Sequence, residues 1–214
     1  MPGSGKRGPG RPPAARVDDT RSRIMQAARS VFSERGYEGA TIQAIAARAG
    51  LTRPAINHYF PSKQALYRVV LNATNESVLG AGINHAQRET TLAARLNAFI
   101  SAAVSANLAC PAGSALLVNG ILESQRHPQW TSTQNDTVRI CREFLNYVVT
   151  DAVDRGDIAT DIDASALAEA LLVMLCGLGL YAGYVEDYQG MLAVIDRVRP
   201  VLLEGGLWGA TPGN

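Results

Sequence analysis

Side chains suited to hydrogen bonding with bases and phosphates gather between positions 41 and 63 of the 214-residue chain. The Arg53 guanidinium can donate a bidentate pair of hydrogen bonds to guanine, and the Asn57 amide can pair with adenine in the same way. Each good pair contributes roughly 1–3 kcal/mol of discrimination between bases. Hydroxyl, ammonium and backbone N–H groups at helix ends suit phosphate oxygens. This stretch therefore favours the recognition of DNA.

Two short helices and a tight turn must position these side chains. Thr41 can cap the first helix, which runs to Ala49, and Gly50 ends it after about two turns. Thr52 can cap the second, very short helix, in which Pro54 is tolerated because it falls in the first turn. This succession predicts a helix-turn-helix, whose second helix enters a major groove about 12 Å wide.

Residues 41–66, TIQAIAARAGLTRPAINHYFPSKQAL, resemble the DNA-binding signature of the tetracycline-repressor (TetR) family of transcriptional regulators. The resemblance covers the chain from about Thr20 to Leu71. Asn57 departs from the family pattern, in which many members have a tyrosine, and Pro54 offers a ring surface but no N–H. The resemblance implies phosphate contacts from Thr41, Thr52, Tyr59 and Lys63, and base contacts from Gln43, Arg53, Pro54, Asn57 and His58.

The first 17 residues are rich in Gly, Pro and Arg, and we expect them to form a disordered basic arm. Residues 6–13 resemble part of an AT-hook, although Pro9 replaces the first arginine of its core. Three alternatives remain for the arm: insertion of Arg11 into a minor groove, a diffuse electrostatic tether, or no role in binding.

The net charge of +1 is a sum of two opposed parts. Residues 1–63 hold eleven basic and four acidic side chains, a net +7, whereas residues 64–214 carry a net −6. Such charge asymmetry is typical of a protein with a nucleic-acid partner.

Three widely spaced cysteines fit a reducing cytosol, and no apolar segment of a signal peptide follows the arm. The uncharged run 170–185 is too short to span a membrane, so we expect a cytoplasmic protein without a membrane partner.

Helical periodicity runs through the rest of the chain, and no segment alternates with the period of a strand. We therefore predict an all-α fold with a disordered arm over 1–17, a helix-turn-helix domain over 18–63 and a helical effector-binding and dimerisation domain over 64–214. The first helix should begin with a cap among Asp18, Asp19 and Thr20 and stop at Gly36. Later helices are expected over residues 64–78, 92–108, 114–123, 133–155, 163–185 and 189–203.

The TetR resemblance weakens after Leu71, but the layout of long helices remains similar. In the family, the last two helices pair with their copies to form a dimer, which implies a homodimer on a palindromic operator. Small residues that allow close helix approach, and tyrosine rings, mark the interface that we expect, although a contact within one chain is the alternative. These residues are Gly177, Gly179, Tyr181, Ala182, Gly183, Tyr184 and Tyr188.

A ligand pocket is expected inside the second domain, where few charges are available. An apolar or amphipathic effector is therefore favoured, and the helix over 64–78 is the expected lever to the DNA-binding domain. Core packing is the alternative role for each candidate lining residue. The candidates are Leu96, Phe99, Ile100, Ala103, Leu117, Ile121, Trp130, Phe144, Val148, Met174 and Leu178.

The sequence gives weaker support for an enzyme than for a DNA-binding regulator. Residues 177–182 match G-x-G-x-x-A, but a dinucleotide site needs that turn between a strand and a helix. No Cys/His spacing fits zinc, and no nucleophile signature is present, so we expect no catalysis, cofactor or metal.

The sequence predicts a repressor released from its operator by a small ligand. The alternative is a ligand-independent DNA-binding protein of nucleoid or adaptor type.

Overall fold

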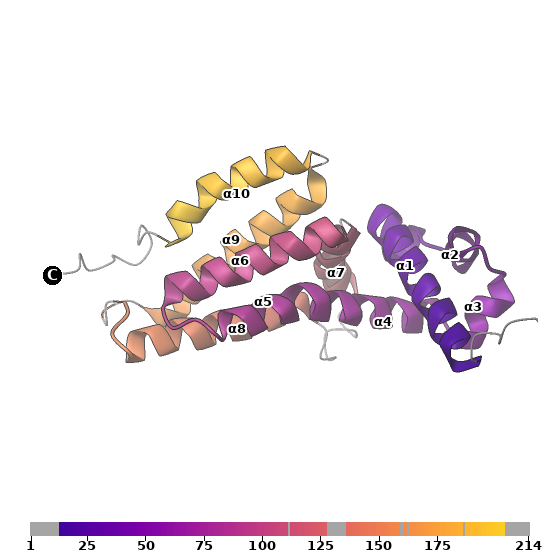
Figure 1. Cartoon of the computed structure of the whole chain (residues 1–214), viewed down its shortest axis with the longest axis horizontal. Coiled ribbons are helices and arrows are strands. Elements are labelled where there is room, and N and C mark those ends of the chain that lie inside the picture. Colours follow the sequence, from indigo (N-terminus) through magenta and orange to yellow (C-terminus); the bar gives the residue numbers. More distant parts are fainter. Residues whose placement is uncertain are drawn as a thin grey trace, which may run out of the picture.

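The computed structural model describes residues 13–110, 112–127, 136–158, 161, 163–185 and 187–203. This part of the chain contains helices and no strand, which confirms the all-α fold. Figure 1 shows α1 to α3 at one end and an elongated helical bundle behind them. The elements are α1 (Pro13–Gly39), α2 (Ile42–Ala49), α3 (Arg53–Tyr59), α4 (Lys63–Asn75), the π-helical η1 (Glu76–Gly80), α5 (Ala81–Ala86), α6 (Leu92–Ala109), α7 (Ala112–Arg126), α8 (Thr137–Asp154), α9 (Ala164–Tyr184) and α10 (Tyr188–Leu203).

Local capping fixes the short helices as predicted. The hydroxyl oxygens of Thr41, Thr52 and Ser62 accept hydrogen bonds from backbone N–H groups in the first turns of α2, α3 and α4. Gly50 follows α2 in the left-handed conformation, with φ of 63°, which glycine adopts without steric cost. The turn between α2 and α3 is therefore encoded locally.

The start of α1 differs from the prediction. The helix begins at Pro13, so residues 13–17 are helical, and the expected caps Asp18 to Thr20 lie inside it. Proline suits the first helical position, and the alanines that follow favour a helix. Gly36 interrupts α1 with φ of 66°, but the element continues to Gly39. Arg11 and the rest of the arm lie outside the described residues.

The N-terminal core extends beyond the predicted boundary at residue 63. Ile24, Phe32, Ile45 and Ile56 are fully buried between α1, α2 and α3. The same core includes Leu66, Tyr67 and Val70 from the first two turns of α4. The apolar stripe of α4 faces α1, so the first domain ends near residue 70.

One continuous rod connects this domain with the bundle. The elements α4, η1 and α5 follow one another from Lys63 to Ala86, well beyond the predicted end at residue 78. Figure 1 shows them as a single line that begins beside α1 and runs along α6. The absence of a side chain at Gly82 permits this contact, because a Cβ atom there would lie 2.8 Å from Phe99.

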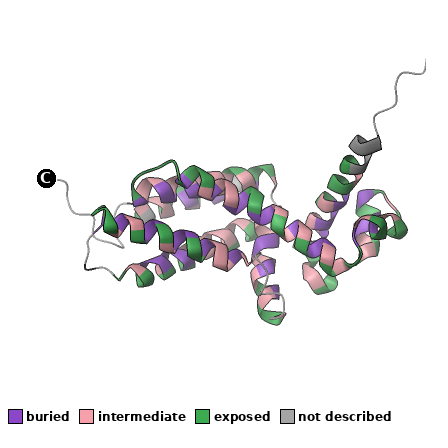
Figure 2. Ribbon diagram, turned by 90° about the horizontal axis from the view of Figure 1, so that it is seen from below, coloured by how far each residue is buried: buried purple, intermediate pink, exposed green. Residues whose placement is uncertain are grey.

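The bundle has its own core, to which α6, α8 and α9 contribute most of the buried residues (Figure 2). Carboxylates of the acidic segment near the end of α8 have structural partners. Asp157 accepts a 2.6 Å hydrogen bond from the backbone N–H of Leu92, and Asp163 caps α9. Asp151 pairs with Arg95 at 2.6 Å. Each of these three carboxylates therefore has a partner within the protein.

By length and composition alone, α6 and α9 could each cross a membrane. The 21 residues of α9 exceed the uncharged run 170–185, because the helix also includes Glu169 and the residues before it. This is weak evidence for a membrane segment, since core helices of soluble proteins have the same composition. In the structure, α9 packs against α7, α8 and α10.

Candidate nucleic-acid interface and effector cavity

The recognition helix α3 presents its polar side to solvent. Thr52, Arg53, Pro54, Asn57 and His58 are exposed, as a DNA-reading surface requires. The opposite side is apolar and packed into the first core, with Ile56 fully buried and Phe60 3% exposed. The structure therefore brings the predicted base-reading residues of α3 to one outer face of the domain.

The predicted residues of α2 adjoin this face. Thr41 and Gln43 are exposed at the start of α2, and Thr41 also caps the helix by accepting a 3.1 Å hydrogen bond from Ala44. Tyr59 is half-buried, and its ring meets the His58 ring edge-on at 5.3 Å. Thr41, Gln43 and Tyr59 can each approach a duplex that lies against α3.

Lys63 has an intramolecular role that its sequence position did not reveal. Its ammonium group donates hydrogen bonds to the carbonyl oxygens of Tyr37, at 2.8 Å, and Ala40, at 3.2 Å. It also lies 4.2 Å from the centre of the Tyr37 ring. In this structure Lys63 joins the start of α4 to the connection between α1 and α2.

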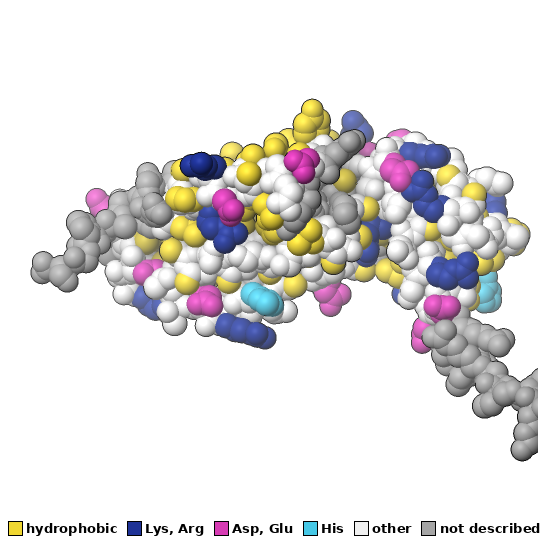
Figure 3. Space-filling view, turned by 45° about the horizontal axis from the view of Figure 1, so that its top comes forward, with side chains coloured by type: hydrophobic (Ala, Val, Ile, Leu, Met, Phe, Trp, Pro, Cys, Tyr) yellow, Lys and Arg dark blue, Asp and Glu magenta, His cyan; other side chains and the backbone are white. Residues whose placement is uncertain are grey.

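Lys and Arg side chains are visible over the end of the molecule that carries the N-terminal helices (Figure 3), and some of them hold the helices together. Arg23 donates a 2.7 Å hydrogen bond to the last carbonyl oxygen of α2, at Ala49. Arg48 and Glu34 form a two-point ion pair between α2 and α1. The hydrogen bond from Arg48 lowers the pKa of the Glu34 carboxyl. These contacts make α1 and α2 a firm support for α3.

The DNA-binding domain is also fastened to the bundle through α7. Leu116 of α7 is fully buried in the first core, and Asn119 donates a 3.0 Å hydrogen bond to the carbonyl oxygen of Ser33 in α1. Arg29 of α1 donates hydrogen bonds to Thr74 in α4 and to the sulfur of Cys110 after α6. These contacts therefore couple the positions of α4 and α7 to that of α1.

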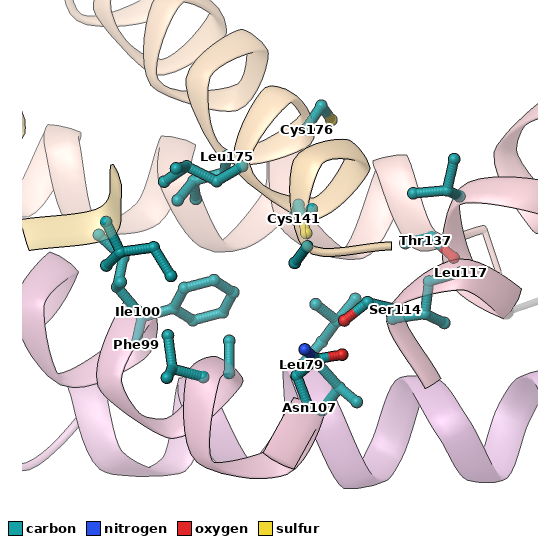
Figure 4. Close-up of a pocket in the computed structure, with 18 of the residues that line it drawn as sticks. Leu79, Phe99, Ile100, Asn107, Ser114, Leu117, Thr137, Cys141, Leu175 and Cys176 are labelled. Carbon is teal, nitrogen blue, oxygen red and sulfur yellow. The ribbon is translucent and has the colours of Figure 1, made fainter. Parts of the chain in front are cut away.

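A cavity of about 120 Å³ lies between helices of the bundle (Figure 4). Its wall is mostly aliphatic and aromatic. The predicted residues that line it are Phe99, Ile100, Ala103, Leu117, Ile121 and Leu178. Two wall residues, Val78 and Leu79, belong to η1, so the rod that begins at Lys63 forms one side of the cavity.

Four predicted lining residues belong to the surrounding core. Leu96, Phe144 and Val148 are buried, Phe144 with its ring stacked on Phe99, and Met174 packs against the same cluster. They share helices with lining residues but project from other positions around each helix. Trp130 lies outside the described residues.

Sequence reasoning missed the polar positions of the wall. Five such residues line the cavity: Asn107, Ser114, Thr137, Cys141 and Cys176. The only feature of the sequence that could have indicated them is their isolated position among apolar residues. Burial raises the pKa of the Cys141 thiol to about 12, which keeps it protonated at neutral pH.

The small residues of α9 divide among three environments. Gly179 and Ala182 line the cavity, and Gly183 packs on α7, where a Cβ atom would lie 3.1 Å from Ala115. These three residues therefore have contacts within the subunit, and their place in a dimer interface stays a prediction. Tyr181 is half-buried, and the side chain of Tyr188 is not described. Gly177 and Tyr184 remain on the outer face.

That outer face of α9 is an exposed apolar stripe. Val173, Leu180 and Tyr184 are 70%, 57% and 81% exposed, and Gly177 lies between them with no group of another described residue within 4 Å of its Cβ position. Positions 173, 177, 180 and 184 follow the spacing of one helix face. A group from outside the subunit can therefore approach the backbone of α9 closely at Gly177.

Two family models match the chain in succession. Residues 24–70 match the bacterial regulatory proteins of the tetR family, and residues 92–197 match the C-terminal domain of BetI-type transcriptional repressors. The chain belongs to the TetR family. It is therefore a DNA-binding transcriptional regulator, as the helix-turn-helix and its resemblance indicated.

Individual TetR-family relatives align along most of the chain. The transcriptional regulator UidR of Escherichia coli K12 is 28% identical over 164 residues, which cover 74% of this chain and 79% of UidR. The repressor AcnR of Corynebacterium glutamicum is 24% identical over 197 residues, covering 84% and 90%. The structure of Bacillus subtilis FadR in complex with stearoyl-CoA has a TM-score of 0.68 at 18% identity, covering 86% and 98%, and this likeness concerns the fold.

Proposed function

We propose that this TetR-family regulator represses transcription in the cytoplasm by binding a palindromic operator as a homodimer, and that a small apolar or amphipathic ligand releases it. One observation carries the proposal. The rod α4–η1–α5 lines the cavity at Val78 and Leu79 and holds the helix-turn-helix domain through Lys63. A ligand in the cavity can therefore act on α3 through one continuous element.

The DNA contacts follow from the exposed face. Arg53, Pro54, Asn57 and His58 of α3, with Gln43 of α2, read base edges, while Thr41, Thr52 and Tyr59 contact phosphates. Lys63 acts by positioning α4 against α1. A dimer places two copies of α3 about 34–36 Å apart, in successive major grooves of a palindrome.

The exposed stripe of α9 supports the dimer. Large apolar side chains such as Leu180 and Tyr184 gain free energy by leaving water, and a glycine between them lets a second helix approach closely. We propose that Val173, Gly177, Leu180 and Tyr184 form the centre of the interface, with the outer face of α10 beside them, where Val201 is 57% exposed.

Release follows from linkage. A ligand that binds more tightly to a conformation with misplaced recognition helices weakens operator binding by the same factor. The π-helical turn of η1 is the part of the rod in contact with the cavity, and such turns are frequent at functional sites. The cavity favours this mechanism over a ligand-independent DNA-binding protein.

A footprint on the DNA upstream of the protein's own gene tests the proposal. We expect protection of a palindrome with half-site centres one helical turn apart, and reporter expression that rises when the gene is deleted. A scrambled sequence of equal length and composition is the control. Equal affinity for both DNAs, with a steep dependence on salt, would instead favour the nucleoid-type alternative.

A further inference from the structure

The side chain of Asn107 is a buried polar group with an unused acceptor. The residue is 7% exposed near the end of α6 and lines the cavity. Its Nδ2 donates to the sulfur of Met191 in α10, at 3.5 Å. Because a thioether sulfur only accepts hydrogen bonds, this contact fixes which end of the amide faces α10. Within the described residues, Oδ1 has no hydrogen-bond partner.

Buried acceptors are nearly always satisfied in folded proteins, so Oδ1 calls for a partner. Figure 4 shows Asn107 and Ser114 in the same part of the cavity, away from Phe99 and Ile100. The hydroxyl of Thr137, also in the wall, already donates to Asn75 at 3.0 Å. The cavity therefore has an apolar part and a part in which a hydrogen bond is available.

The rest of the wall defines the charge of a suitable occupant. The described lining residues include no Lys, Arg, His, Asp or Glu. A carboxylate or an ammonium group in this cavity would lose its hydration without gaining an opposite charge, which is strongly unfavourable. An uncharged molecule avoids that cost.

We propose that the cavity binds an uncharged molecule with an apolar body and a hydroxyl or N–H group that donates a hydrogen bond to Oδ1 of Asn107. The apolar body lies against Phe99 and Ile100, and the donor lies toward Asn107 and Ser114. The inference rests on the proposed function, because it specifies the chemistry of the ligand in the same cavity. Asn107 is then a specificity-determining residue.

Calorimetric titration of the full chain with three ring compounds tests this chemistry. The probes are 4-methylphenol, which has a donor, its methyl ether 4-methylanisole, which has none, and the anion 4-methylbenzoate. A small ring suits the volume, since a cavity of about 150 Å³ binds benzene. The variants are Asn107→Leu, which keeps the approximate shape, and Asn107→Ala. The control is Asn84→Leu, the same change at an exposed position of α5.

We expect the wild-type chain and Asn84→Leu to bind the phenol, and the anion at least tenfold more weakly. The ratio of ether to phenol dissociation constants should fall roughly tenfold in Asn107→Leu, and the ether should still bind. Asn107→Ala should show the same loss of discrimination, which guards against a folding defect confined to one variant. Thermal melts identify folded samples.

Three results would overturn the inference: no binding of the phenol by wild type, an unchanged ratio in both Asn107 variants, or equal affinity for the anion. Operator binding is measured on the same samples. Absence of operator binding by the ligand-free wild-type chain refutes the proposed function, whereas intact operator binding without probe discrimination refutes only the ligand chemistry.

Discussion

The ammonium nitrogen of Lys63 lies 4.2 Å from the centre of the Tyr37 ring and donates a 2.8 Å hydrogen bond to the carbonyl oxygen of the same residue. One side chain thereby uses a cation–π contact and a hydrogen bond to hold the first turn of α4 against the end of α1. This contact helps to fix α4 against the helix-turn-helix domain, which suggests a direct test.

Replacing Lys63 with Met should lower the free energy of unfolding by about 1–2 kcal/mol, because both contacts are lost. Operator affinity should fall, but its dependence on salt should keep the same slope, since no phosphate contact is removed. Chemical denaturation and fluorescence anisotropy at several salt concentrations measure the two quantities. A slope smaller by about one unit would show that Lys63 contacts a phosphate in the complex.

Replacing Arg53 with Ala should weaken operator binding by roughly 1–3 kcal/mol and relax the base preference at one position of each half-site. The exposed guanidinium on α3 has the geometry for bidentate contact with guanine. Binding to a set of operators with single substitutions measures both effects. Arg88→Ala, at an exposed position after α5, is the charge-matched control. An equal loss on operator and unrelated DNA would assign Arg53 to a phosphate instead.

Replacing Leu180 with Arg should convert the dimer to a monomer, because it puts a charge at the centre of the apolar stripe on α9. Operator affinity should fall more than tenfold, since each subunit then binds one half-site alone. Analytical ultracentrifugation reports the oligomeric state. Asn84→Arg adds the same side chain at an exposed position of α5 and should leave the dimer intact. A dimeric Leu180→Arg variant would place the interface on another surface.

Alkaline pH should destabilise the first domain through the buried Tyr67 and the half-buried Tyr37. Burial, and then the charge of Glu123, raises the pKa of Tyr67, and burial also raises the pKa of Tyr37. The unfolded chain loses these protons near pH 10 while the folded chain keeps them. The contribution of Tyr67 is therefore fully present below pH 10 and is lost above it, by up to about 1.4 kcal/mol per pH unit. The contribution of Tyr37 changes in the same direction but is smaller, because solvent screens this partly exposed group.

The phenylalanine variant of Tyr67 should show a shallower loss of stability between pH 9 and pH 11 than wild type. Urea unfolding at several pH values measures this slope. Tyr147→Phe changes a tyrosine that is 58% exposed and should follow wild type. Parallel curves for Tyr67→Phe and wild type would mean that another group sets the alkaline transition.

Local chemistry explains which parts of the fold could be predicted. The bounds of α2 and α3 depend on Thr41, Gly50 and Thr52, whose capping preferences act within a few residues. The expected start of α1 was wrong because Asp18 and Thr20 are possible caps on sequence grounds, yet the preceding alanines extend the helix to Pro13. The capping preference of Asp18 and Thr20 competed there with the helix propensity of the preceding alanines, and α1 is longer than predicted.

The site was less predictable where it depends on how helices cross. Phe99 and Phe144 are both buried aromatic residues, and only their places in the bundle put one in the cavity wall and the other behind it. Likewise, Gly179 and Gly183 share a sequence pattern with Gly177, but they face the cavity and α7. The role of Lys63 depends on the carbonyl groups of Tyr37 and Ala40, which lie 26 and 23 residues away in the sequence and meet Lys63 only when α4 packs against α1.

Glycine at position 177 costs a helix about 0.5–1 kcal/mol relative to alanine, and in the described part of the subunit no group within 4 Å of its Cβ position requires it. In the proposed dimer, that cost is offset by the approach of the second subunit. The isolated protomer is then less stable than an alanine variant would be. The melting temperature of the protein should accordingly rise with its concentration, which couples the amount of regulator in the cell to its resistance to unfolding and proteolysis.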